Sequence, residues 1–256
     1  MMKIVFFDID GTLLDHEKSL PASAKKAIKT LQENGVFVAI STGRAPFMFK
    51  ALREELDIDT FVSFNGQYVV FENNVIYQNP LSPEEVEKLK NHAGKQDTAL
   101  VFMNEQTMKS TVQNNGRVKE AMGTLKFPHP EQDGDFYKDK EIYQSLLFCS
   151  EEEEHQYIGH YDKFRFIRWH ELCLDVLPAG GSKAEGIKIL MDKIGFKLDD
   201  VYAFGDGLND IEMLQAVGHG VAMGNALEEV KKHADFVTKD VDDDGILYGL
   251  KHLKLI

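Results

Sequence analysis

The chain has 256 residues, enough for one large domain or two modest ones, and 43% of them are hydrophobic, so a buried core is expected. Acidic residues number 42 against 29 Lys and Arg, which gives a formal net charge of −13. A surface of that average charge repels nucleic acid and anionic membranes, and since the sequence contains no local basic patch, neither is an expected partner.

The apolar run at the start of the sequence ends at Asp8 and is far shorter than the core of a signal peptide. No apolar run approaches the roughly 18 residues that a membrane-spanning helix needs. The two cysteines, Cys149 and Cys173, follow no disulfide or metal-binding pattern and are expected to be buried and reduced. These features predict a cytoplasmic protein.

Residues 1–80 alternate short apolar runs with amphipathic stretches, a pattern typical of parallel strands joined by helices. The predicted elements are strands at 4–7 and 36–40 and helices at 21–34 and 45–56. Residues 61–71 are predicted to form a hairpin on a type I′ turn at Asn65-Gly66.

From about residue 80 the pattern changes to short strand candidates that follow a helix start at Ser82-Pro83. The predicted strands are 99–103, 107–112, 143–149, 164–169 and 173–177, and a helix is predicted over 151–161. Together these elements are expected to form a separate α/β layer.

The first pattern resumes at Gly180-Gly181-Ser182, where Ser182 and Glu185 have the spacing of a capping box. A helix is therefore predicted from Lys183 to Ile194, ended by Gly195. The remaining predicted elements are strands at 201–204, 221–223 and 236–237 and helices at 208–217 and 226–233. The sequence predicts a doubly wound α/β domain with a mostly parallel sheet, formed by residues 1–80 and 180–256, with residues 81–179 inserted as a second domain.

Two acidic motifs follow two of the predicted buried strands. They are Asp8-Ile9-Asp10-Gly11-Thr12 and Gly205-Asp206-Gly207-Leu208-Asn209-Asp210. Because parallel strands end at the same edge of a sheet, Asp8, Asp10 and Asp206 are expected to converge there, with Asp210 just behind. Gathered carboxylates repel one another unless a hard cation lies among them, so the sequence predicts a Mg²⁺ site.

Two other segments bring hydrogen-bond donors and positive charge to this edge. Thr42, Gly43 and Arg44 follow the strand at 36–40 and offer a hydroxyl, backbone N–H groups and a guanidinium. Lys183 lies in the first turn of a predicted helix, where the N-terminal amides already favour an anion. We expect these groups to form a phosphate-binding cradle opposite the carboxylates.

The two acidic motifs, Thr42 and Lys183, taken in this order, resemble the four motifs of the haloacid dehalogenase (HAD) superfamily of phosphohydrolases. Asn65-Gly66, the segment 41–44 and the segment 222–226 look like its Cof-like branch, type IIB. The resemblance covers the whole chain. It implies a Rossmann-like catalytic core in residues 1–80 and 180–256 and an α/β cap in 81–179 that determines substrate specificity.

The resemblance also implies roles for single residues. Asp8 is expected to attack phosphorus, and Asp10 to act as general acid and then general base. The implied Mg²⁺ ligands are Asp8, the backbone carbonyl of Asp10 and Asp206, with Asp210 in support. The groups expected to bind phosphate or substrate are Ile9 through its amide, Thr42, Gly43, Arg44, Lys183 and Asn209.

The function predicted in this way is a Mg²⁺-dependent phosphatase that hydrolyses small phosphorylated metabolites, sugar phosphates among them, through an aspartyl-phosphate. One alternative is a phosphomutase of the same superfamily. Another is a non-catalytic phosphoacceptor or binding protein, against which Asp10 argues, because such a protein needs no acid or base beside its acceptor. The sequence determines neither the substrate nor the oligomeric state.

The acidic segment 240–245 matches the first half of a calcium loop. Its twelfth position is Lys251, where that loop requires a bidentate Glu, so no calcium site is expected.

Overall fold

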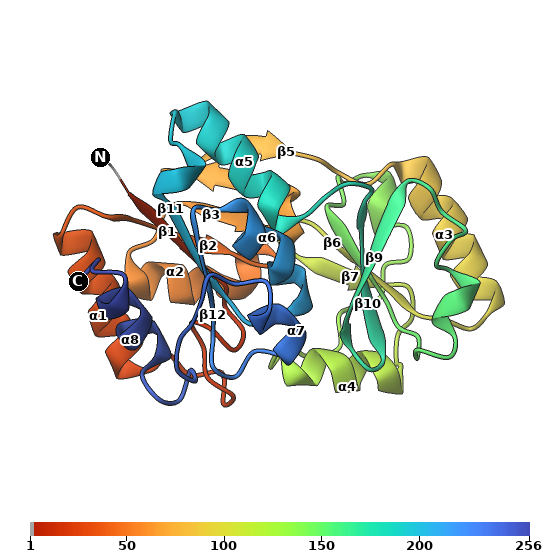
Figure 1. The fold of residues 1–256 in the computed structure, drawn as a ribbon. Helices are drawn as coiled ribbons and strands as arrows, with labels where there is room; N and C mark the ends of the chain where they lie inside the picture. The colour runs from red at the N-terminus through yellow and green to blue at the C-terminus, as the bar shows by residue number, and fades with distance from the viewer. Residues whose placement is uncertain (1–2) are drawn as a thin grey trace. The chain divides into compact units, whose positions relative to one another are not determined.

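Residues 3–256 are described by a computed structural model, in which they form two compact units (Figure 1). The first unit comprises the chain up to Arg44, Phe49–Tyr77 and Ser182–Ile256. The second comprises Ala45–Met48 and Gln78–Gly181. The first unit is therefore built from three separate stretches of the chain.

An eight-stranded sheet forms the centre of the first unit, in the order β13-β12-β11-β1-β2-β3-β4-β5. The strands are β1 (Ile4–Phe7), β2 (Phe37–Ser41), β3 (Phe61–Ser63), β4 (Tyr68–Phe71), β5 (Asn74–Gln78), β11 (Val201–Gly205), β12 (His219–Ala222) and β13 (Phe236–Val237). Neighbouring strands from β13 to β3 are parallel, whereas β4 is antiparallel to β3. Every residue of β1 and β11 is buried, as expected for central strands covered on both faces.

Helices cover both faces of this sheet (Figure 1), which confirms the predicted doubly wound fold. They are α1 (Ala22–Glu33), α2 (Lys50–Leu56), α5 (Lys183–Ile194), α6 (Ile211–Ala216), α7 (Glu228–Lys231) and α8 (Gly245–His252). On one face, Ile187 of α5 belongs to the same apolar cluster as Phe6 and Ala203 of the sheet. On the other face, Gly249 of α8 lies against the ring of Phe204, and α8 contacts α1.

The second unit contains a five-stranded antiparallel sheet in the order β7-β6-β8-β10-β9. Its elements are α3 (Pro83–Lys95), β6 (Leu100–Met103), β7 (Met108–Ser110), α4 (Gly116–Thr124), β8 (Gln144–Leu147), β9 (Phe164–His170) and β10 (Cys173–Pro178). Val86 and Leu89 of α3 pack with Phe102 and Val176 in one apolar cluster. The two cysteines are free and buried, as predicted.

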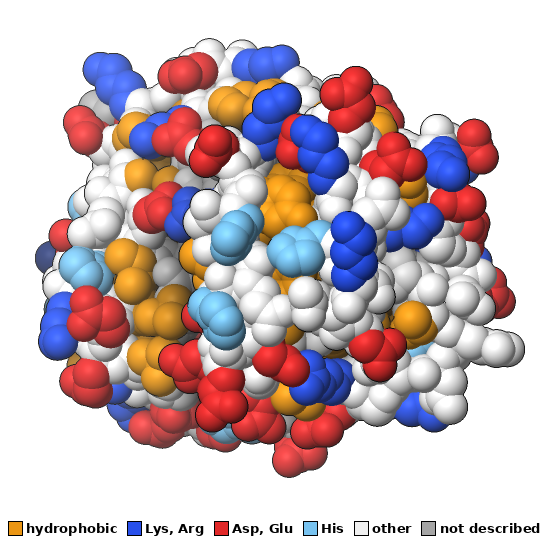
Figure 2. All heavy atoms as spheres, turned by 90° about the vertical axis from the view of Figure 1, so that its right-hand side faces the viewer, with side chains coloured by type: hydrophobic (Ala, Val, Ile, Leu, Met, Phe, Trp, Pro, Cys, Tyr) orange, Lys and Arg blue, Asp and Glu red, His pale blue; other side chains and the backbone are white. Residues whose placement is uncertain are grey.

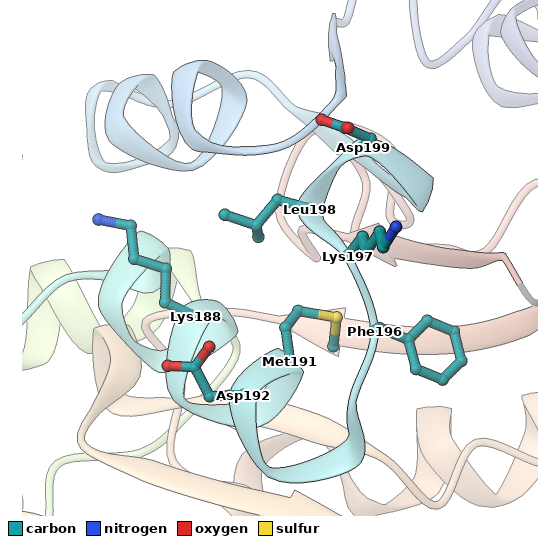
Figure 3. Close-up of a pocket in the computed structure, with 7 residues that line it drawn as sticks. All are labelled: Lys188, Met191, Asp192, Phe196, Lys197, Leu198 and Asp199. Carbon is teal, nitrogen blue, oxygen red and sulfur yellow. The ribbon is translucent and has the colours of Figure 1, made fainter.

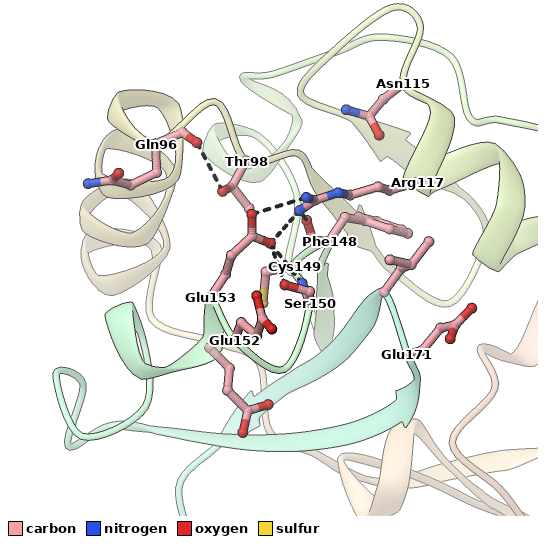
Figure 4. A network of polar contacts seen from close by, with 12 residues as sticks. Gln96, Thr98, Asn115, Arg117, Phe148, Cys149, Ser150, Glu152, Glu153 and Glu171 are labelled. Atoms are coloured by element: carbon pink, nitrogen blue, oxygen red, sulfur yellow. Dashed lines mark hydrogen bonds and ion pairs between the residues drawn. The ribbon is translucent and has the colours of Figure 1, made fainter.

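The predicted helix over 151–161 is wrong, because the structure has a single 3-10 turn there, at Glu154–Gln156. The carboxylate of Glu153 accepts hydrogen bonds from Arg117 and from the backbone and hydroxyl of Ser150 (Figure 4). The side-chain bond from Arg117 is the main reason why the pKa of Glu153 falls to about 2. These contacts hold the segment in turns. The helices α4 and α8 were not predicted from the sequence.

The β3–β4 hairpin is confirmed, but its connection is wider than a two-residue type I′ turn. Ser63 pairs with Tyr68, so four residues connect the strands. Phe64 and Asn65 both adopt a φ of 51° and Gly66 a φ of 100°. In the wider loop the N–H of Asn65 donates to the carbonyl of Thr42 at 3.0 Å, which brings Asn65 beside the Thr42 segment at the end of β3.

Two glycines set the distance between this loop and the start of α5. A Cβ on Gly66 would lie 2.0 Å from the carbonyl oxygen of Ser182. A Cβ on Gly186 would lie 2.6 Å from Cγ1 of Val62 and 2.8 Å from Cα of Gly66. No side chain fits at either position, so the two backbones are in direct contact and the first turn of α5 is held against the loop.

We expect Gly186→Ala to lower the free energy of unfolding by about 1–3 kcal/mol, because the methyl group overpacks this contact. Gly94→Ala in α3 is the matched control, since a Cβ there meets nothing within 4 Å. That control should stabilise the protein by about 0.5–1 kcal/mol through helix propensity. Urea unfolding measures both changes, and an unfolding free energy of Gly186→Ala equal to that of the wild type would contradict the tight contact.

Candidate active site

Four polar segments of the first unit meet at one edge of its sheet. In the paired register, Phe7 at the end of β1 lies beside Phe204 of β11 and Ile40 of β2. Because the three strands are parallel, the loops that follow them leave the sheet side by side. These loops carry the Asp8, Asp206 and Thr42 motifs, and the first turn of α5 adds Lys183.

Lys183 is the central cation of the site, and its side chain is fully buried. Its Nζ donates to Oδ1 of Asp8 at 2.6 Å and to Oδ1 of Asp210 at 2.7 Å. Burial alone would lower the pKa of this amine, but Asp210 and Asp8 outweigh burial and raise the pKa. Lys183 is therefore a permanent cation in contact with Asp8.

The α5 helix that carries Lys183 begins and ends as the sequence predicts. The hydroxyl of Ser182 accepts from the N–H of Glu185 at 3.2 Å, which caps the first turn. Gly195 ends the helix with a φ of 76°. The cap and the Gly66 contact together determine where Lys183 lies.

Asp210 uses both of its carboxylate oxygens within the protein. Oδ1 accepts from Lys183, and Oδ2 accepts from the backbone N–H groups of Asp206 and Gly207, at 3.0 and 2.9 Å. A side chain engaged in this way orients its neighbours. The geometry favours a supporting role over a direct place among the metal ligands for Asp210.

Asp8, Asp206 and Asp210 form an acidic cluster in which one oxygen of each lies within 4.8 Å of the others. Burial is the largest cause that raises the pKa of Asp8 to about 7, with Lys183 opposing and Asp210 and Asp10 adding to it. Burial and the negative charges of Asp8 and Asp210 raise the pKa of Asp206 to about 8. The site therefore carries more negative charge than Lys183 neutralises.

A divalent cation fits this donor set. Asp8 and Asp206 keep carboxylate lone pairs that no hydrogen bond uses, and the carbonyl of Asp10 accepts no hydrogen bond from residues 3–256. Hard cations such as Mg²⁺ prefer these oxygen donors and keep water in their remaining positions. An added positive charge would also offset the burial and the carboxylate repulsion that raise both pKa values.

Asp10 turns its carboxylate away from the acidic cluster and toward two cations. The guanidinium of Arg44 donates to both of its oxygens, at 2.7 and 2.6 Å, and Nζ of Lys18 donates to Oδ1 at 2.6 Å. Burial opposes ionisation, but Arg44 and Lys18 outweigh it and lower the pKa of Asp10. Arg44, which is expected to bind phosphate or substrate, thus donates to Asp10 through Nε and Nη2 in this structure.

The other groups expected to bind phosphate lie around Asp8. The N–H groups of Ile9 and Asp10 donate to no acceptor within residues 3–256. The hydroxyl of Thr42 accepts from the N–H of Arg44, which leaves its proton available as a donor. Gly43 packs against the amide of Asn65 and cannot carry a side chain without crowding it, since a Cβ would lie 3.0 Å from Nδ2.

Asn209 is positioned by Asn65, a residue that was predicted from the sequence to lie in a turn. Its Nδ2 donates to Oδ1 of Asn65 at 2.9 Å. Asn65 is 1% exposed and has a left-handed backbone, so the wider β3–β4 loop brings it to the site. In the sequence, the Asn65-Gly66 pair was the feature from which Asn65 could have been recognised as a site residue.

Three further contributors were not singled out as site residues. Lys18 has no motif around it and adopts a φ of 58° in a loop. Thr12 and Asn225 both donate to Asp206, at 3.1 and 3.4 Å. From the sequence, Thr12 and Asn225 could have been recognised only because each lies within a segment that resembles the family.

Other candidate sites lie apart from this cluster. Figure 3 shows a surface pocket between α5 and residues 196–199, and none of its lining residues carries a site role. His16, Asp240 and Asp242 also bring ligand atoms within 4.8 Å of one another, but His16 and Asp242 are exposed.

On the face seen in Figure 2, Lys and Arg side chains are interspersed with Asp and Glu. None of the helices within 3–256 combines the length and apolar character that a membrane crossing requires.

Comparisons with known proteins place this site in a family. The profile of the haloacid dehalogenase-like hydrolases matches residues 5–250. The chain belongs to this family. The putative phosphatase YkrA of Bacillus subtilis is 53% identical over 99% of this chain and 98% of its own length.

Solved structures agree with the assignment. A hypothetical protein of Geobacillus kaustophilus has a TM-score of 0.94 and 58% identity, with complete coverage of both chains. The HAD subclass IIB sugar phosphatase BT4131 has a TM-score of 0.89 and 33% identity, also with complete coverage. The predicted HAD-type phosphatase of the Cof-like branch is thereby confirmed. Phosphatases of this superfamily generally use a divalent metal, and the chain has the buried acidic cluster to hold one.

The raised pKa values predict an unusual pH dependence for this HAD phosphatase when it is free of metal. With a usual value of 3.8, Asp8 and Asp206 titrate near 7 and 8 in the folded state, so the folded protein holds protons that the unfolded chain releases. Stability is then lost as the pH rises from about 4 to about 8. Asp206→Asn should lose less stability over this range.

Thermal unfolding in excess chelator at several pH values measures this effect. Asp192→Asn, a surface carboxylate of α5, is the control and should keep the wild-type pH dependence. If Asp206→Asn also keeps it, the pKa of Asp206 is not raised in the folded protein.

Proposed function

We propose that the protein is a Mg²⁺-dependent phosphatase that hydrolyses small phosphorylated metabolites, sugar phosphates among them, through an aspartyl-phosphate on Asp8. The observation that carries the proposal is the contact between the buried Lys183 and Asp8, beside the second carboxylate of Asp206. A nucleophile, a fixed cation and the ligands for a second cation are then within reach of one phosphoryl group. The name of the sugar phosphatase among the structural relatives supports the substrate class.

Asp8 supplies the nucleophile. Lys183 holds Oδ1, and Oδ2 is left to attack phosphorus. A bond forms between Oδ2 and phosphorus while the bond to the leaving oxygen breaks, which gives the aspartyl-phosphate and an alkoxide that must be protonated. Water then attacks the same phosphorus and returns Asp8 as a carboxylate.

Asp10 acts as the general acid in the first step and as the general base in the second. Protonated, it gives its proton to the leaving oxygen; ionised, it takes a proton from the attacking water. Arg44 and Lys18 stabilise the ionised form that the second step needs. The first step requires Asp10 to leave these two cations and carry a proton toward the substrate.

The phosphoryl oxygens bind to Lys183, the hydroxyl of Thr42, and the amides of Ile9 and Asp10. Asn209, oriented by Asn65, is proposed to add a further donor. Mg²⁺, held by Asp8, Asp206 and the Asp10 carbonyl, supplies positive charge that offsets the phosphate and the carboxylates. Positioning and neutralisation of charge account for most of the catalysis of phosphoryl transfer.

Residues 1–80 and 180–256 are proposed as the catalytic core and the insertion 81–179 as the cap that selects the substrate. The catalytic groups above contact only the phosphoryl group and the leaving oxygen, so they do not distinguish one alcohol of the substrate from another. Asp175 and Gln144 are buried polar residues of the insertion, joined by a hydrogen bond of 3.0 Å. Asp175 lies between Leu174 and Val176 of the apolar cluster, so strand alternation places it on the opposite face of the sheet.

Asp8→Asn is expected to abolish phosphatase activity and to leave the fold intact, because the side chain keeps its size but loses its charged attacking oxygen. The assay is phosphate release from p-nitrophenyl phosphate with Mg²⁺, and wild-type activity should disappear in excess chelator. Asp15→Asn, in the loop beyond the motif, is the control and should retain wild-type activity.

Retained activity of Asp8→Asn above a few per cent, or full wild-type activity in chelator, would overturn this mechanism. Release of all the phosphate to water, with none transferred to a sugar acceptor, distinguishes a phosphatase from a phosphomutase. A wild-type protein that takes up one phosphate without turnover would show a phosphoacceptor instead.

We propose that the carboxylate of Asp175 takes part in the selection of the sugar by the insertion, and the variant Asp175→Asn tests this role. It should lower kcat/KM for the preferred sugar phosphate by roughly 10- to 100-fold, the effect of one hydrogen bond to a charged group. Activity on p-nitrophenyl phosphate should change by less than about threefold, since aryl phosphate needs no sugar contact. Asp162→Asn, an exposed residue of the insertion, is the control; an unchanged order of preference among a panel of sugar phosphates in Asp175→Asn would contradict the assignment.

A further inference from the structure

The carboxylate of Asp206 is held from both sides by hydrogen bonds. Its Oδ1 accepts from the hydroxyl of Thr12 at 3.1 Å, and its Oδ2 accepts from Nδ2 of Asn225 at 3.4 Å. Gly11 makes room for the carboxylate in this position, because a Cβ there would lie 2.3 Å from Oδ2. Each oxygen therefore keeps a lone pair whose direction is determined by the protein.

The orientation of the Asn225 amide follows from its third partner. Its Oδ1 accepts from the backbone N–H of Val241 at 3.0 Å. Because that N–H can only donate, the oxygen of the amide must face Val241, and the NH₂ group must face the other side. There Nδ2 donates to the carbonyl oxygen of Gly11 at 2.8 Å as well as to Asp206.

The loop that carries Val241 is itself held rigidly. Gly224 donates to the carbonyl of Lys239 at 2.8 Å, and Gly245 donates to that of Asp240 at 3.0 Å. The hydroxyl of Thr238 donates to the carbonyl of Gly245 at 2.6 Å. The acidic segment 240–245 thus provides a fixed backbone donor for Asn225. This contact gives a role to a segment that the catalytic mechanism does not use.

We propose that Asn225 is a positioning residue for metal binding: it connects the loop before α8 to Gly11 and Asp206 and, with Thr12, presents Asp206 to the cation in its binding orientation. The inference rests on the proposed function, because it takes Asp206 as a metal ligand. It assigns a role to two segments, 222–226 and 240–245, that lie outside the four catalytic motifs. Asn225 contacts neither the substrate nor the nucleophile in this role.

The test measures Mg²⁺ binding directly, by titration calorimetry on the full-length, metal-free protein without substrate. Asn225→Ala removes both the donor to Asp206 and the acceptor for Val241, and should weaken Mg²⁺ binding by roughly 10- to 100-fold, as is typical when a ligand loses its supporting hydrogen bond. Thr12→Val, which has nearly the same shape but lacks the donor, should weaken it in the same direction. At saturating Mg²⁺, kcat of both variants should return to within a few-fold of the wild type.

Asn74→Ala is the matched control. Its Nδ2 also donates to a backbone carbonyl, that of Glu72 at 2.9 Å, but on the exposed strand β5. It should bind Mg²⁺ as the wild type does. If Asn225→Ala does not fold, Asn225→Ser, whose hydroxyl is too short to span from Val241 to Asp206, is measured in its place with the same expectation.

An unchanged Mg²⁺ affinity in a folded Asn225 variant would overturn the inference, even if the variant is less stable. A kcat that stays low at saturating Mg²⁺ would also overturn it, because Asn225 would then act in a chemical step. Failure of the proposed function is a separate result: in that case the wild type itself binds no Mg²⁺, or Asp8→Asn remains active.

Discussion

The burial of Lys183 between Asp8 and Asp210 is the interaction on which the rest of the candidate site depends. A buried amine and two buried carboxylates lose their hydration, and the loss is offset only where the ion pairs are short and the remaining lone pairs are satisfied. The backbone N–H groups of Asp206 and Gly207 satisfy the second oxygen of Asp210. Lys183 reaches both carboxylates because α5 starts at a capped Ser182 and packs on the Gly66 loop without intervening side chains.

Four aspartates at one edge of the sheet differ in chemistry because their surroundings differ. Asp210 has both oxygens engaged and serves as a support. Asp8 and Asp206 have raised pKa values because they are buried with too little positive charge. Asp10, only two residues from Asp8, has a lowered pKa because Arg44 and Lys18 contact its carboxylate. The same side chain thus has both oxygens bound within the protein, a raised pKa or a lowered pKa according to its neighbours.

The site also depends on parts of the chain that carry no reactive group. Gly11 and Gly186 are required because other atoms occupy the space of a side chain. Asn65, in a strained loop, and Asn225, beside the last helix, each hold another site residue through one amide. Loops from both ends of the sequence therefore act together on Asp206, although more than 190 residues separate Thr12 from it.

The sequence by itself determined the parallel core, the convergence of the Asp8 and Asp206 motifs and the start of α5, because these depend on local patterns: buried runs, strand ends and an N-cap serine. It also indicated the family from the motifs around Asp8, Thr42 and Lys183. Tertiary structure alone decided that Arg44 and Lys18 bind Asp10. It also decided that both oxygens of Asp210 accept hydrogen bonds, from Lys183 and from backbone amides. In the same way, the contacts of Glu153 hold its segment in turns instead of a helix. The physical reason is that side-chain hydrogen bonds between residues far apart in the chain leave no periodic signal, and their strength depends on distances and burial that only the folded chain defines.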